Sequence, residues 1–66
     1  MHTTNTQDGT RFIGAREAEA LTSISRYTLW RMEREGKFPK SVKLGSKRAW
    51  IESEVRAWMA EKIASR

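Results

Sequence analysis

Cationic side chains are concentrated in the middle of this sequence. Positions 26 to 48 carry eight Lys or Arg and two acidic residues, whereas the remaining positions carry five basic and six acidic residues. The formal net charge of +5 for the 66-residue chain therefore comes from this one segment. A domain polarised in this way is suited to bind a polyanion, and the chemistry available to these side chains is recognition of phosphates and base edges.

The candidate nucleic-acid contacts combine these cations with neighbouring hydroxyl-bearing residues. They are Ser25, Arg26, Tyr27, Thr28, Arg31, Arg34, Lys37, Lys43, Ser46, Lys47 and Arg48. Arg26 directly follows a predicted helix N-cap, where a cation opposes the helix dipole. We interpret this placement as a sign that a phosphate or base edge compensates for the charge. Lys40 belongs to the same basic run, and Thr28 has an alternative interpretation as an ordinary residue of the capping turn.

Three tryptophans are numerous for a chain of this length, and each can bury a large apolar area. We expect Trp50 and Trp58 to lie in the core. For Trp30 we favour packing against the following hairpin, near Phe38 or Pro39. Stacking on a nucleic acid is the alternative for this residue.

Two short helices are predicted to present the first part of the basic segment. The run 15–21 (AREAEAL) is rich in helix formers, with Gly14 at the N-cap position. A second helix is expected to follow Ser25 as its N-cap and to stop at Gly36, with Leu29 and Met32 facing inward. Helices joined by three or four residues form a helix-turn-helix.

The rest of the basic segment is predicted to form a β-hairpin. Phe38-Pro39 favours an extended chain, Val42 and Leu44 alternate with polar residues, and the run 45–47 (GSK) is expected to form the turn. A last helix, beginning between positions 51 and 53, would place Val55, Trp58 and Met59 on one face. The fold class predicted is therefore mainly α with a small β-hairpin, a winged helix-turn-helix.

Composition also limits what the chain can be. The polar run 1–10 is predicted to be a disordered leader before one domain at 11–66, with Phe12 and Ile13 as a very short extended segment. There is no cysteine, and the one histidine, His2, lies in this leader. We therefore expect no enzyme activity, no metal, no cofactor and no small-molecule substrate. No signal segment or long apolar run is visible, which predicts a cytoplasmic protein without a membrane partner.

The combined pattern resembles the AlpA family of prophage regulatory proteins, within the MerR-like and excisionase-like winged-helix group. The matching elements are Ser25-Arg26-x-Thr28-Leu29-x-Arg31-Met32, Glu35-Gly36-Lys37-Phe38-Pro39, Val42-Lys43-Leu44-Gly45 and Trp50-x-x-Ser53-Glu54-Val55-x-Ala57-Trp58. The similarity covers about residues 11 to 64. Glu33 departs from it, because relatives often have an apolar residue there. The resemblance implies a protein of phage or bacterial origin that binds double-stranded DNA and regulates transcription of integration and excision genes.

Two alternatives to this function remain open at the level of sequence. An excisionase that bends attachment-site DNA would use the same fold. A protein-interaction module would instead dock a partner through exposed aromatic residues such as Trp30 and Phe38, and its positive face would be incidental. On DNA, one small helix and wing make a small half-site, so self-association or cooperative binding on repeated sites is a further expectation that the sequence does not decide.

Overall fold

A computed structural model describes residues 11–66, which form three helices and three short strands. The elements are β1 (Phe12–Ile13), α2 (Ala15–Thr22), α3 (Arg26–Arg34), β2 (Val42–Leu44), β3 (Lys47–Ile51) and α4 (Glu52–Ala64). The strands form one antiparallel sheet in the order β1-β3-β2. The predicted fold class is confirmed, whereas the predicted leader at 1–10 lies outside the described residues. Within residues 11–66, no helix is long and apolar enough to cross a bilayer.

The turn between α2 and α3 is held by hydrogen bonds at both helix ends. The α2 helix ends at Ser23, which adopts a left-handed conformation and donates its backbone N–H to the Glu19 carbonyl at 2.7 Å. Ser25 is the N-cap of α3, as predicted, and its Oγ accepts from the backbone N–H of Thr28 at 3.3 Å. Because both helix ends are satisfied within a three-residue connection, α3 begins at a fixed position relative to α2.

The end of α3 is fixed by Gly36, again as predicted. Gly36 has a φ of 77° and donates its N–H to the Glu33 carbonyl at 3.1 Å, while the Lys37 N–H donates to the Met32 carbonyl at 2.8 Å. This pair of bonds is the Schellman motif, which turns the chain sharply away from the helix axis. The segment that follows therefore leaves the helix axis and leads to the hairpin.

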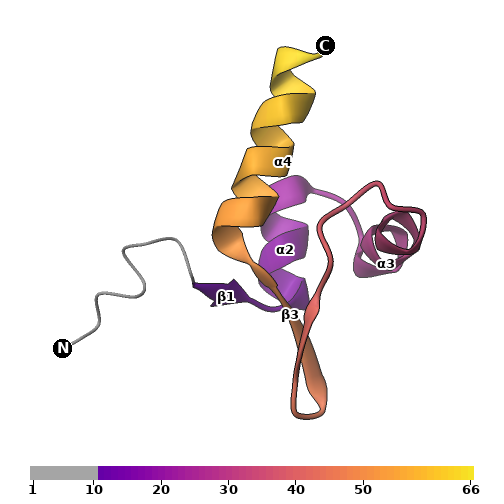
Figure 1. Cartoon of the computed structure of the whole chain (residues 1–66), viewed down its shortest axis with the longest axis vertical. Helices are drawn as coiled ribbons and strands as arrows, with labels where there is room; N and C mark the ends of the chain where they lie inside the picture. The colour runs from indigo at the N-terminus through magenta and orange to yellow at the C-terminus, as the bar shows by residue number, and fades with distance from the viewer. Residues whose placement is uncertain (1–10) are drawn as a thin grey trace, which may run out of the picture.

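The wing is the hairpin of β2 and β3, which projects away from the helices (Figure 1). Leu44 pairs with Lys47, so the turn contains two residues, Gly45 and Ser46, with a φ of 64° at Gly45. The sequence placed Lys47 in this turn, but the structure places it in β3. A left-handed first turn residue is typical of type II′ hairpins, whose twist matches that of the strands. The opposite end of β3 pairs with β1, with Phe12 opposite Ile51.

The core lies where the two helices, the sheet and α4 meet. Trp50 is fully buried together with Ile13, Leu29 and Val55, and its indole N–H donates to the Pro39 carbonyl at 3.1 Å. Core placement of Trp50 is thus confirmed. Trp58 packs on the edge of this cluster against Phe38, with ring centroids 4.9 Å apart, and donates its indole N–H to the Lys37 carbonyl at 2.8 Å. The two indoles therefore hold the chain that links α3 to the wing.

Candidate nucleic-acid interface

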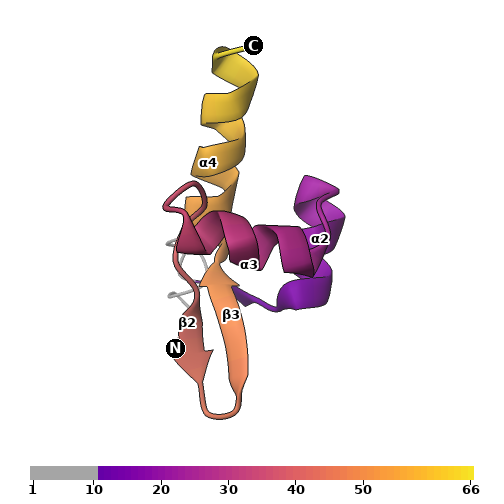
Figure 2. The ribbon, with the colours of Figure 1, turned by 90° about the vertical axis from the view of Figure 1, so that its right-hand side faces the viewer.

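The outward face of α3 is a stripe of exposed aromatic and cationic side chains. Leu29 points inward and is fully buried, whereas Tyr27 is 74% exposed and Trp30 is 39% exposed. Arg31 and Arg34 are exposed as well. These four residues are spaced i, i+3, i+4 and i+7, which places them along one side of a helix. Figure 2 shows α3 lying across the front of the molecule with the wing below it.

Arg26 lies at the start of α3 and is engaged by Glu19 of α2. Both Glu19 carboxylate oxygens accept from the guanidinium at 3.1 Å, and Oε2 also accepts from the Arg26 backbone N–H at 2.7 Å. The hydrogen bonds from Arg26 lower the pKa of Glu19, and those from Glu19 raise the pKa of Arg26. A carboxylate within the protein therefore compensates for the cation at this helix end, which is the role that the sequence argument gave to a phosphate. Contact of Arg26 with DNA stays a prediction.

A second carboxylate joins α3 to the wing. Glu33 accepts hydrogen bonds from the Ser41 backbone N–H at 3.0 Å and from the Ser41 hydroxyl at 2.9 Å. The same hydroxyl oxygen accepts from the Arg48 guanidinium of β3 at 2.8 Å. Sequence reasoning noted Glu33 only as a departure from an apolar position. The structure shows that this side chain positions the base of the hairpin, because it is half-buried between α3 and Ser41.

Two open hollows separate α3 from the wing, and cations line both. One, of about 670 Å³, is lined by Arg34, Lys40 and Arg48 together with Trp30 and Glu33. The other, of about 560 Å³, is lined by Arg16, Arg26, Ser46 and Lys47, again with Trp30 and Arg48. Trp30 and Arg48 border both hollows, so the hollows adjoin. The basic groove, as we call this pair of hollows, draws cations from α2, α3, the loop after α3 and β3.

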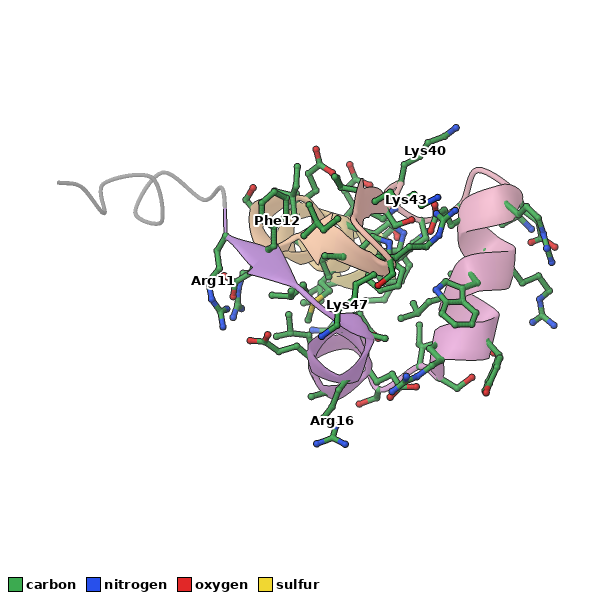
Figure 3. All side chains as sticks on the ribbon, turned by 90° about the horizontal axis from the view of Figure 1, so that it is seen from below. Arg11, Phe12, Arg16, Lys40, Lys43 and Lys47 are labelled. Atoms are coloured by element: carbon green, nitrogen blue, oxygen red, sulfur yellow. The ribbon has the colours of Figure 1, made fainter. Side chains whose placement is uncertain are left out.

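The lysines occupy different sides of the hairpin. Viewed from below, Lys40 and Lys43 lie on the side near one end of α3, whereas Lys47 lies on the side near α2, with Arg16 beyond it (Figure 3). Lys37 lies apart from the basic groove. It borders a depression with Trp58 and two glutamates of α4, and its Nζ is 3.7 Å from a carboxylate oxygen of Glu35.

The structure brings together five of the eleven residues predicted from sequence. They line the basic groove, namely Arg26, Arg34, Ser46, Lys47 and Arg48. Tyr27 and Arg31 lie on the outward face, Ser25 and Thr28 form the N-cap, and Lys43 lies on the wing. The set predicted from sequence omitted Arg16, Trp30 and Lys40. The basic run already contained Lys40, but no local pattern shows that the first turn of α2 approaches the hairpin tip.

An exposed second helix, joined by a three-residue turn to the first and flanked by a basic β-hairpin, defines a winged helix-turn-helix protein. The chain belongs to the family of the prophage CP4-57 regulatory protein (AlpA), whose sequence profile matches residues 11–63. The resemblance found in the sequence is thereby confirmed. This family is one of regulatory proteins and not of enzymes. Residues 11–66 contain no group of three or more His, Cys, Asp or Glu side chains arranged to hold a metal ion.

A relative from enterobacteria phage P4, the uncharacterized protein ORF88, is 47% identical to this chain over 57 residues. The aligned region covers 85% of this chain and 65% of that relative, so the chain spans somewhat less than two thirds of the relative's length. No solved structure matches the chain significantly.

Proposed function

We propose that this chain is a sequence-specific double-stranded DNA-binding protein that regulates prophage integration and excision genes in the host cytoplasm. One observation carries the proposal: the exposed face of α3 borders a groove lined by cations from several elements. Membership of a prophage regulatory family supports the same conclusion.

In this proposal α3 enters the major groove and the wing contacts the flanking backbone. An α-helix with its side chains is about 10–12 Å across, and the major groove is about 12 Å wide, so one helix such as α3 fits into it. Arg31 and Arg34 then face base edges. Lys47 and Arg48 of the wing, and Lys43 beside them, face phosphates. The Glu33–Ser41–Arg48 hydrogen bonds fix the angle between helix and wing, so both can engage one duplex together.

The experiment begins with selection of sites from a random duplex library, followed by affinity measurements over a range of salt concentrations. Spacing between repeated motifs in the selected sites reports whether more than one copy binds. For the parent, log affinity should fall linearly with log salt, with a slope of about −0.9 for each phosphate neutralised. Lys47→Ala should weaken binding to all sequences alike and reduce that slope by about one phosphate. Arg31→Ala should instead reduce the preference for the selected site.

The matched control is Arg66→Ala, because Arg66 is the last residue of the chain and lies at the opposite end of the molecule from the wing (Figure 1). It removes the same charge as Lys47→Ala. Equal losses from Lys47→Ala and Arg66→Ala would show that net charge alone governs binding. That result would contradict the proposed interface.

A further inference from the structure

Tyr27 and Trp30 form an aromatic pair on the exposed side of α3. Their ring centroids are 5.5 Å apart and the planes meet at 87°, an edge-to-face arrangement one helical turn apart. Neither ring belongs to the buried cluster of the core. The pair therefore presents a preformed apolar surface beside the basic groove.

The aromatic residues of the core are engaged differently. Trp50 and Trp58 both pack against Phe38, and both donate their indole N–H to backbone carbonyls. Among residues 11–66, no hydrogen bond engages the indole N–H of Trp30 or the hydroxyl of Tyr27. Tyr27 is 74% exposed and Trp30 is 39% exposed, and an exposed apolar patch with a polar rim is typical of a binding surface.

The rim of this patch is cationic. Arg31 and Arg34 continue the same stripe towards the C-terminal end of α3, and Trp30 borders both hollows of the basic groove. A DNA-reading surface made only of cations would contact phosphates and guanine edges. This stripe adds an apolar portion, and that portion suits an apolar group of the ligand.

We propose that Tyr27 and Trp30 recognise thymine through its C5-methyl group in the major groove. This inference rests on the proposed DNA-binding function and names the base that the helix selects. The thymine methyl is the one apolar group that a base pair presents in the major groove, and arginine pairs with the O6 and N7 atoms of guanine. Tyr27 and Arg31 are separated by about 6 Å along the helix, close to two base-pair steps. Bound sites should therefore contain thymine within about two steps of a guanine.

The test replaces each thymine of a selected site, one at a time, by uracil. This change removes the methyl group and leaves base pairing intact. Binding of the full-length parent should weaken about fourfold at one or two thymines, as expected for the loss of one buried methyl group. Tyr27→Ala and Trp30→Ala should bind the thymine duplex less tightly and should no longer distinguish it from the uracil duplex at those positions.

Phe12→Ala is the matched control for both variants. Phe12 is another exposed aromatic residue, 48% exposed, but it lies on β1 on the other side of the molecule from α3 (Figure 3). This variant should respond to uracil as the parent does. Circular dichroism spectra of all three variants would show whether each one forms its helices. The comparison of thymine and uracil duplexes uses the parent protein alone, so it does not depend on any variant folding.

The outcomes separate this inference from the proposed function. Sequence-specific binding by the parent with equal affinity for thymine and uracil at every position would overturn thymine recognition and leave the DNA-binding proposal standing. Absence of sequence-specific duplex binding would overturn both. If binding depended instead on an unpaired base, mismatched duplexes would bind more tightly than matched ones. Major-groove recognition by the aromatic pair would then be wrong.

Discussion

Two glutamates hold the candidate interface in place through hydrogen bonds to neighbouring elements. Glu19 joins α2 to the start of α3 through Arg26, and Glu33 joins α3 to the wing through Ser41. Both are half-buried, so their hydrogen bonds are less exposed to competing water than those of a fully solvated pair. Single carboxylates therefore help to fix the position of α3 relative to α2 and to the wing.

The Glu19 contact should make stability depend on pH. Hydrogen bonds from Arg26 hold the pKa of Glu19 below its usual value of 4.5 in the folded state. Its contribution is therefore complete above the unfolded-state pKa and is lost as the pH falls through the lowered folded-state pKa. We expect the urea midpoint of the parent to drop more steeply between about pH 5 and pH 2 than that of Glu19→Gln. Parallel curves for the two proteins would contradict this role.

Glu52 also has a pKa lowered by hydrogen bonds from Arg11 and Arg56, so the stability of the parent depends on pH through this second carboxyl as well. A control variant is therefore needed to assign the difference to Glu19. Glu61→Gln removes an exposed carboxyl near the end of α4. It should follow the parent curve throughout.

For Glu33, the electrostatic effect and the positioning effect on DNA affinity are expected to have opposite signs. Removing an acidic group beside a DNA-binding surface should strengthen binding if only electrostatics matters. If Glu33 positions the wing, Glu33→Ala should weaken binding severalfold, because Ser41 loses the carboxylate that holds it and its hydroxyl no longer fixes Arg48. Glu35→Ala is the control, since Glu35 is exposed and contacts Lys37 at 3.7 Å. It should bind as tightly as the parent or more tightly, and a gain in affinity for Glu33→Ala would contradict the positioning role.

At the scale of elements, the glycine that ends α3 directs the chain into the wing. Gly36 has a positive φ, and a Cβ added there would meet no atom within 4 Å, so any cost of substitution is conformational. Gly36→Ala should lower the free energy of unfolding by about 1 kcal/mol, as for an L-residue forced into the left-handed region. Chemical denaturation measures this value directly. A stability equal to that of the parent would mean that the Schellman turn tolerates a side chain.

Local signals were sufficient to predict most of these elements. Ser25 before the helix, Gly36 after it and the alternation at Val42 and Leu44 each act through neighbours close in sequence, and the structure confirms the elements they predicted. The pairing of Phe12 with Ile51 could not be predicted in the same way. A two-residue strand carries almost no periodicity, and its partner lies far along the chain.

The same limit explains which parts of the candidate site were missed. Glu19 is seven residues from Arg26, and Glu33 is eight residues from Ser41. Each pair crosses a turn, so neither follows from helical spacing. The position of Arg26 in the sequence therefore predicts an external phosphate, whereas the structure provides an internal carboxylate. Lys37 was predicted to belong to the site because it lies in the basic run. The turn after Gly36 instead places it near Trp58, apart from the basic groove.

The whole molecule depends on a small core. A chain of 66 residues has a free energy of unfolding of roughly 3–10 kcal/mol. The buried cluster is built around one indole, because Trp50 is fully buried, packs against Phe38 and donates a hydrogen bond to the Pro39 carbonyl. Loss of this side chain would remove a large part of the stability of the fold, whereas Trp30 contributes to the surface.

Two tryptophan variants test this division of the molecule into core and interface. Trp50→Ala should cost about 3–5 kcal/mol, a large fraction of the whole stability, and should strongly lower the midpoint of the thermal transition or abolish it. Trp30→Ala removes the same side chain from a site 39% exposed and outside the buried cluster, so it should retain a cooperative thermal transition. Circular dichroism melts of both variants measure the difference. If Trp30→Ala also unfolded, α3 would need its indole for packing against the wing, and the surface that we assign to DNA would instead be part of the core.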